Sequence, residues 1–162
     1  VFSADSSADS SLKPFHSDSL DEIINARQGT PYLLVLWSID CPPCLQELAQ
    51  LQQLRDQFSS TSLVLVSTDE MHMADDVAKM LSSFQLQQMD SWIFAESIPE
   101  RLRYMIDPTW YGELPRSYFY PSSSQRRAHS GRLSKIELMQ WLHQIQQETR
   151  LNTNLKTTMV IQ

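Results

Sequence analysis

Two short apolar runs, separated by a segment with helical spacing, limit what this chain can fold into. The first run covers Pro31–Ile39 (PYLLVLWSI) and the second Ser62–Ser67 (SLVLVS). Runs of this length are typical of strands buried on both faces of a sheet. Between them, apolar residues recur every three or four positions and indicate one buried helix face: Leu48, Leu51, Leu54 and Phe58. This order predicts a parallel βαβ unit with a right-handed crossover.

The rest of the chain extends this unit into an α/β layer fold with a mixed sheet flanked by helices. Capping boxes and amphipathic spacing predict four further helices, at or after Ser19–Glu22, within Val77–Phe84, at Ile98–Ile106 and after Ser134–Glu137. A short strand is expected at Ser91–Ala95. Arg116–Tyr120 and Gln125–His129, separated by a Pro-Ser-Ser-Ser turn, predict an antiparallel hairpin.

The length of 162 residues corresponds to one domain. We expect residues 15–147 to form it, after a flexible Ser/Asp/Ala-rich leader at 1–14 and before a loose tail at 148–162, in which no period is evident. No intact signal peptide is encoded, although Phe2-Ser3-Ala4 is compatible with the end of a cleaved signal or with a linker from a removed anchor.

The charge balance excludes some classes of partner. Lys and Arg total 13 and Asp and Glu total 19, which gives a net charge of −6. An acidic chain is poorly suited to bind nucleic acid or an anionic membrane. With only 3 glycines, the chain also lacks the Gly-rich loops that cradle phosphates.

The two cysteines, Cys41 and Cys44, lie in a Cys-Pro-Pro-Cys segment between the first strand and the long helix. A cysteine at a helix N-terminus is stabilised as a thiolate, so Cys41 is expected to attack disulfides and the more shielded Cys44 to resolve the mixed disulfide. A purely structural disulfide is disfavoured, because so small a loop removes little unfolded-state entropy. A zinc site would need about two further ligands. A redox-active dithiol is therefore favoured.

The two prolines bear on the redox properties of the pair. If Cys41 is the N-cap, Pro42 and Pro43 occupy the first two helical positions, and Pro43 has no N–H to donate. Only the N–H of Cys44 then remains for the Cys41 sulfur, and Asp40 adds a neighbouring negative charge. Both effects raise the thiolate pKa, which predicts a reductant or a protein of moderate potential rather than a strong oxidant.

At this point the sequence resembles the thioredoxin superfamily, and within it the TlpA/ResA-like extracytoplasmic thiol–disulfide oxidoreductases. The resemblance covers about residues 15–147 and rests on Val35–Cys44 (VLWSIDCPPC), Gly112–Pro115 (GELP), the hairpin and the final helix. It implies a thioredoxin-like fold. Two positions depart from the family: Asp40 replaces the usual aromatic residue, and Ala49 stands where a proline commonly kinks the helix.

The resemblance also implies roles for individual residues. Pro115 would be a cis-proline facing the cysteines, with its neighbour Leu114 and the adjacent backbone meeting the substrate chain. Trp37 would pack under the active-site loop. We therefore assign substrate binding to five residues: Pro115, Leu114, Trp37, Pro42 and Pro43.

Glu47 matches the family's Cys-x-x-Glu pattern. The buried acid of thioredoxin is replaced here by Val35, and Glu47 could substitute for it by taking the proton of Cys44. A solvated surface glutamate is an equal alternative. The predicted catalytic residues are thus Cys41, Cys44 and Glu47.

By resemblance we expect no cofactor beyond the Cys41–Cys44 pair. The expected partners are proteins with cysteines or disulfides and a soluble or membrane-bound dithiol protein. The expected setting is periplasmic or otherwise extracytoplasmic, with anchoring left open and with roles such as cytochrome c maturation. We expect a monomer.

Two alternatives stay open. The Met71-His72-Met73 segment could form a Cu(I) site with the cysteine pair, although an incidental loop is the simpler interpretation. Trp110 and Tyr111 could line a peptide groove or pack in the core.

Overall fold

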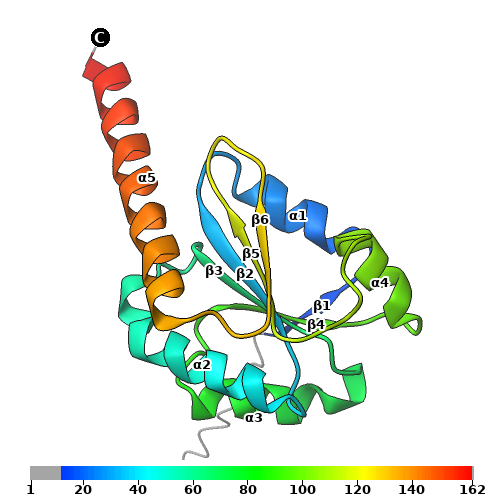
Figure 1. The fold of residues 1–162 in the computed structure, drawn as a ribbon. Helices are drawn as coiled ribbons and strands as arrows, with labels where there is room; N and C mark the ends of the chain where they lie inside the picture. Colours follow the sequence, from blue (N-terminus) through cyan, green and yellow to red (C-terminus); the bar gives the residue numbers. More distant parts are fainter. Residues whose placement is uncertain (1–11, 162) are drawn as a thin grey trace, which may run out of the picture.

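A six-stranded sheet with the order β1-β4-β3-β2-β5-β6 forms the centre of the protein, which a computed structural model describes over residues 12–161 (Figure 1). Its first four strands in that order are parallel; β5 runs antiparallel to β2, and β6 antiparallel to β5. The strands are β1 (Leu12–Phe15), β2 (Tyr32–Trp37), β3 (Leu63–Ser67), β4 (Asp90–Phe94), β5 (Arg116–Tyr120) and β6 (Arg127–Ser130). The predicted mixed sheet is confirmed.

Helices cover both faces of this sheet (Figure 1). The α-helices are α1 (Ser19–Ala26), α2 (Pro42–Leu54), α3 (Ala74–Ser83), α4 (Pro99–Ile106) and α5 (Lys135–Ile161). Two short 3-10 helices, η1 (Arg55–Gln57) and η2 (Met71–Met73), follow α2 and precede α3. Buried side chains of α2, α3 and α5 share one core cluster, whereas those of α1 and α4 share the other.

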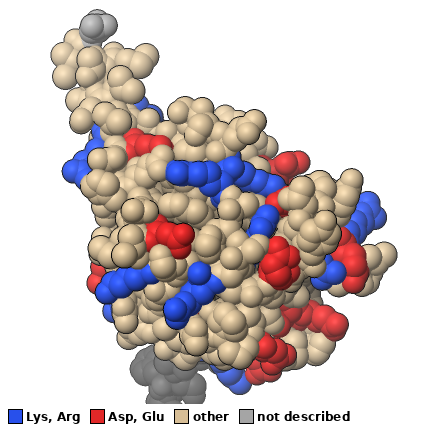
Figure 2. Space-filling model, in the orientation of Figure 1, with Lys and Arg blue, Asp and Glu red and all other residues tan. Residues whose placement is uncertain are grey.

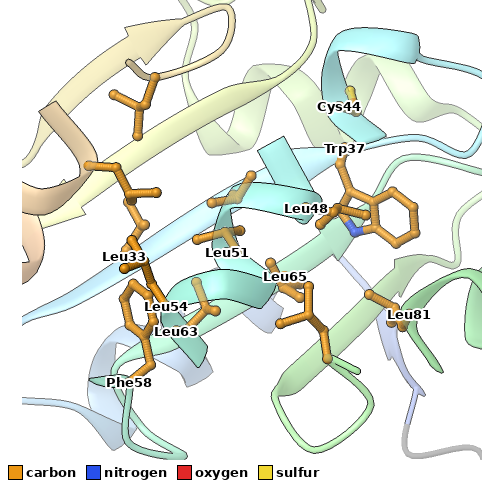
Figure 3. Close-up of a cluster of buried hydrophobic side chains, with 14 of the residues drawn as sticks. Leu33, Trp37, Cys44, Leu48, Leu51, Leu54, Phe58, Leu63, Leu65 and Leu81 are labelled. Carbon is orange, nitrogen blue, oxygen red and sulfur yellow. The ribbon is translucent and has the colours of Figure 1, made fainter. Parts of the chain in front are cut away.

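Strand β2 explains why its sequence is continuously apolar. Leu33, Val35 and Trp37 belong to the cluster beneath α2, and the intervening Leu34 and Leu36 belong to the cluster on the opposite face. Every residue of the strand is buried, as predicted. Figure 3 shows the first cluster, with Trp37 and Cys44 at one end and Phe58 at the other. Burying each such side chain stabilises the fold by about 1.5–3 kcal/mol.

The sequence did not predict strand β1. The sequence predicts a flexible leader over residues 12–14, but Leu12–Phe15 pairs in parallel with Ser91–Phe94 at the edge of the sheet. Pro14 is compatible with this place because an edge strand leaves one row of backbone groups unpaired. The remainder of the predicted leader, residues 1–11, lies outside the described residues.

The prediction of a loose C-terminal tail is wrong for residues 148–161, because α5 continues as one helix to Ile161. The chain has neither proline nor glycine after Gly131 to stop it. The extension projects beyond the body of the protein (Figure 1), and on the face shown in Figure 2 its end carries few charged side chains. Over residues 12–161, no helix is both long and apolar enough to cross a membrane.

Candidate active site

The Cys-Pro-Pro-Cys segment begins α2 in the way the sequence predicts. Cys41 is the N-cap, with extended backbone angles, and Pro42 and Pro43 occupy the first two helical positions. The N–H of Cys44 donates to Cys41 Sγ at 3.2 Å. Because Pro43 has no N–H, it provides no second donor to this sulfur.

The two cysteines form a disulfide whose Cα atoms are 5.2 Å apart. They differ in accessibility: Cys41 is half-buried, whereas Cys44 is fully buried in the cluster that contains Trp37 (Figure 3). An attacking sulfur must be reachable and a resolving sulfur must be shielded from other thiols, so the difference suits the predicted roles. Trp37 is also fully buried, so it supports the active-site loop and has no surface to offer a substrate; its assignment to substrate binding is corrected accordingly.

Glu47 is not a surface residue. It is fully buried on α2, one turn after Cys44. Its Oε2 accepts a hydrogen bond of 2.9 Å from the backbone N–H of Leu133, and its Oε1 has no hydrogen-bond partner among the described residues. Burial raises the pKa of Glu47 to about 7, although the Leu133 N–H and the charge of Arg132 act to lower it. This carboxyl group can therefore take up or release a proton near neutral pH.

The Leu114–Pro115 peptide bond is cis, as the resemblance implied. The antiparallel register pairs Leu36 of β2 with Arg116 of β5. Pro115 immediately precedes Arg116, so it lies at the end of the sheet where β2 leads into residues 38–41. Leu114 is half-buried and packs against both core clusters. The sheet thus brings the cis-proline peptide to the end that carries the disulfide.

Asp69, which the sequence analysis missed, follows strand β3 and is hydrogen-bonded to the loop that leads from β2 to Cys41. Its carboxylate accepts hydrogen bonds from Ser38 Oγ at 2.7 Å, from the Ile39 N–H at 3.1 Å and from Ser67 Oγ at 2.6 Å. Its position just after a buried parallel strand could have indicated it, because loops at the carboxyl ends of such strands build sites.

A second group that the sequence analysis missed is built around Asp107 and includes Arg116, the residue after the cis-proline. Asp107, which is 7% exposed, accepts hydrogen bonds from Arg116 at 2.9 Å, from Tyr118 at 2.9 Å and from the N–H and hydroxyl of Thr109. Burial acts to raise the pKa of Asp107, but these hydrogen bonds outweigh it and hold the pKa well below its usual range. An arginine at the start of an aromatic-rich, buried strand was the available signal, since a buried charge requires a partner.

The structure separates the two aromatic residues before the cis-proline loop. Trp110 is buried, and its indole N–H donates to the Glu113 carbonyl at 2.8 Å. Tyr111 is 92% exposed. Of the two alternatives for this pair, core packing holds for Trp110, while Tyr111 lies on the surface.

The structure does not gather the Met71-His72-Met73 segment into a ligand set. Met73 packs against the core, whereas Met71 and His72 are exposed and His72 lies 3.2 Å from Glu70. Within the described part of the chain, no three His, Cys, Asp or Glu side chains are placed to share a metal ion. A Cu(I) role for this segment stays a prediction.

A hollow of about 1040 Å³ lies elsewhere, beside α3 and the β1–β4 edge, and is lined by residues that include Arg27, Lys79 and Asp90. None of the predicted site residues lines it.

Comparison with known proteins identifies the architecture. No protein-family model and no curated protein matches the chain. Among solved structures, a secreted disulfide oxidoreductase of Mycobacterium tuberculosis, homologous to E. coli DsbE, matches with a TM-score of 0.57 and 18% identity over 74% of this chain and 84% of that one. The chain has a thioredoxin-like fold.

Two further structures support this fold. A thioredoxin-family thiol:disulfide interchange protein of Chlorobium tepidum matches with a TM-score of 0.58 and 16% identity, over 75% of this chain and 84% of that one. A secreted thiol-disulfide isomerase of Corynebacterium glutamicum matches with a TM-score of 0.61 and 13% identity, over 76% of this chain and 75% of that one. The predicted thioredoxin-like fold, with the cysteine pair at a helix N-terminus, is confirmed.

Proposed function

We propose that this protein is a thiol–disulfide oxidoreductase that exchanges disulfides with protein cysteines through Cys41 and Cys44. The observation that carries the proposal is the asymmetric pair itself: a half-buried sulfur at the N-cap of α2 is bonded to a fully buried one. The cis-proline peptide at the same end of the sheet supports it. Similarity in fold to thiol–disulfide oxidoreductases adds further support.

The proposed reaction begins with the reduced dithiol. The Cys41 thiolate attacks one sulfur of a substrate disulfide, forms a mixed disulfide and releases the other substrate sulfur as a thiolate. Cys44 then attacks Cys41 Sγ, which releases the second substrate thiolate and forms the Cys41–Cys44 disulfide. Two electrons pass from the cysteine pair to the substrate. Another dithiol protein must then reduce the Cys41–Cys44 disulfide before the next cycle.

Glu47 would serve the second step. Cys44 must lose its proton before it can attack, and it is fully buried, so water is not its natural base. Glu47 lies one turn further along the same helix. Its Oε1 has no hydrogen-bond partner in the described part of the chain, and burial raises the pKa of its carboxyl group to about 7. A group with this pKa is ionised often enough to accept the proton and can return it when the disulfide is reduced again.

We further propose that the protein acts as a reductant or at moderate potential. The Cys44 N–H donates to Cys41 Sγ, and the two prolines have no N–H that could add a second hydrogen bond. The exposed Asp40 places a negative charge at the position before Cys41. A strongly oxidising pair needs a highly stabilised thiolate, which this environment does not favour.

The substrate and the cellular setting are parts of the same proposal. The substrate chain would bind along Leu114 and Pro115, next to Pro42 and Pro43. Two of the similar structures are of secreted proteins, which supports an extracytoplasmic setting. Reducing the cysteines of proteins such as apocytochromes, as a monomer, would fit that setting.

A disulfide-reduction assay tests the function. A fluorescent peptide with one disulfide is mixed with the reduced wild type, Cys41→Ser or Cys44→Ser. We expect turnover by the wild type only, together with a trapped mixed disulfide in Cys44→Ser. Equal rates for all three proteins would refute the catalytic assignment.

A further inference from the structure

The two residues on either side of the cis-proline dipeptide are joined through one serine of the neighbouring strand. Ser130, at the end of β6, donates from Oγ to Glu113 Oε1 at 2.7 Å. Arg116 Nη1 donates to the same Ser130 Oγ at 2.5 Å. Since Glu113 precedes Leu114 and Arg116 follows Pro115, the chain Glu113–Ser130–Arg116, here called the Ser130 bridge, encloses the dipeptide.

Both ends of the bridge are fixed. The Arg116 guanidinium is buried and donates to Asp107. The other carboxylate oxygen of Glu113 accepts from the backbone N–H of Tyr111 at 3.1 Å. Burial acts to raise the pKa of Glu113, but the hydrogen bonds that it accepts, from Ser130 first, lower it below its usual value. The carboxylate is therefore charged at neutral pH and remains a strong acceptor.

The backbone of the dipeptide is hydrogen-bonded at Pro115 and, in the described part of the chain, unpaired at Leu114. The N–H of Gly131 donates to the Pro115 carbonyl at 2.8 Å, which attaches the loop to the residue that follows Ser130. Within residues 12–161, neither the N–H nor the carbonyl of Leu114 takes part in a hydrogen bond. These two groups are of the kind that pair with an extended chain in strand-like recognition.

We propose that the Ser130 bridge is a positioning device that holds the Leu114–Pro115 backbone in the orientation needed to bind a substrate polypeptide. The inference rests on the proposed function and names the residues that act through this loop. A loop ordered before binding loses less conformational entropy when the substrate arrives, so the bridge should increase affinity for chains long enough to pair with Leu114. A substrate disulfide that is too small to reach that backbone should gain little affinity from the bridge.

The experiment compares a peptide with a small molecule. The fluorescent disulfide peptide and 2-hydroxyethyl disulfide are each reduced by the wild type, Ser130→Ala and Ser130→Thr, and kcat and KM are measured separately. In Ser130→Ala we expect the ratio of the peptide KM to the small-disulfide KM to rise about three- to tenfold, the loss that one ordinary hydrogen bond predicts for a residue that acts only through the loop. Ser130→Thr keeps the hydroxyl group and should restore most of the wild-type ratio.

Two further variants separate positioning from a general effect. Ser124→Ala removes an exposed hydroxyl from the β5–β6 turn and should behave as the wild type. Glu113→Gln removes the charge from the bridge but keeps an acceptor, and it should raise the KM ratio less than Ser130→Ala. Thermal melts of all variants check that each is folded.

An unchanged KM ratio in Ser130→Ala, or an equal rise for both substrates, would overturn the inference while leaving the proposed function intact. The same holds if Ser130→Thr is as defective as Ser130→Ala. Failure of the wild type to reduce either disulfide would instead overturn the proposed function, and the inference with it.

Discussion

Glu47 and Asp107 are both buried carboxylic acids at the end of the sheet that carries the disulfide, yet their surroundings move their pKa values in opposite directions. Glu47 accepts one backbone hydrogen bond, its other oxygen has no partner among residues 12–161, and burial raises its pKa to about 7. Asp107 is surrounded by donors, including Arg116, and its pKa is lowered. Burial alone therefore does not decide the charge of an acid; the number of donors around it does.

The difference divides the two sides of the site by role. Asp107 stays charged and is hydrogen-bonded to Arg116, the residue after the cis-proline, whereas Glu47 can change its charge and lies one helical turn after Cys44, which loses a proton in the proposed reaction. Four experiments test these assignments.

The largest effect is expected from Asp107→Ala. The substitution leaves the buried Arg116 guanidinium without its main partner, with Glu113 only at 3.6 Å. We expect a loss of about 3–5 kcal/mol in the free energy of unfolding, measured with urea at pH 7. Adding Arg116→Met to the same variant should recover part of the loss, because it removes the uncompensated charge. A loss under about 1 kcal/mol would show that Asp107 is no anchor.

Glu47 predicts a stability that falls as pH rises. The folded-state pKa of about 7 exceeds the ordinary value of 4.5, so the folded protein binds more protons than the unfolded chain between these values. The free energy of unfolding should therefore decrease from about pH 4.5 to pH 7 by on the order of 3 kcal/mol, and level off above. Urea titrations of the oxidised protein across this range measure it.

Glu47→Gln is the matched variant for this slope, since its amide oxygen can still accept from Leu133. We expect the slope between pH 4.5 and 7 to flatten. The contribution of Asp107 falls in a different window: its stabilisation is present above its unfolded-state pKa and is lost only as the pH falls below about 4. An unaltered slope in Glu47→Gln would assign the titration to another group.

Glu47→Gln should also slow resolution of the mixed disulfide, because Cys44 loses its proton acceptor. We expect the rate at pH 7 to fall about ten- to a hundredfold. Stopped-flow release of a labelled peptide from Cys41 measures this step, and Glu22→Gln, an exposed acid on α1, is the control. Wild-type and variant proteins with the same rate and the same pH profile would leave Glu47 without a catalytic role.

The smallest effect is expected from Pro43→Ala, which tests whether the number of hydrogen-bond donors also sets the pKa of the Cys41 thiolate. Alanine restores a backbone N–H at the second helical position, where it can donate to Cys41 Sγ. The thiolate pKa should fall, and alkylation of Cys41 by iodoacetamide at pH 6 should become about threefold faster. Pro42→Ala is the control, because an N–H at the first position is not directed at the N-cap side chain. Slower alkylation of Cys41 in Pro43→Ala would show that an added N–H donor does not lower the pKa of this thiolate.

Local sequence patterns predicted the helix starts with uneven success. In the box Ser134-Lys-Ile-Glu137, the backbone N–H of each end residue donates to the side chain of the other, as predicted. Ser19 of the first box instead lies inside α1, and its hydroxyl accepts from the N–H of His16, while Asp18 is the N-cap. The same residue pattern can satisfy either arrangement, and the path of the chain entering from β1 selects one.

The sequence alone determined the parts of the protein whose cause is local. The apolar run in β2 could be stable only with both faces covered, and the Cys-Pro-Pro-Cys order set Cys41 as the N-cap and the Cys44 N–H as a donor to its sulfur. These features depend on neighbours within a few residues. The sequence also made Glu47 a candidate, but two interpretations of it were equally compatible with the pattern.

The remaining features depend on residues far apart in the chain, so they are defined only once the chain is folded. Glu47 is buried since the loop before α5, 86 positions on, lies against it. Strand β1 exists since β4 offers it an edge, and the Ser130 bridge forms since β6 returns beside the cis-proline. Hydrophobic patterns specify which faces of a helix or strand must be buried. They do not specify which distant polar groups come into contact when those faces are packed together.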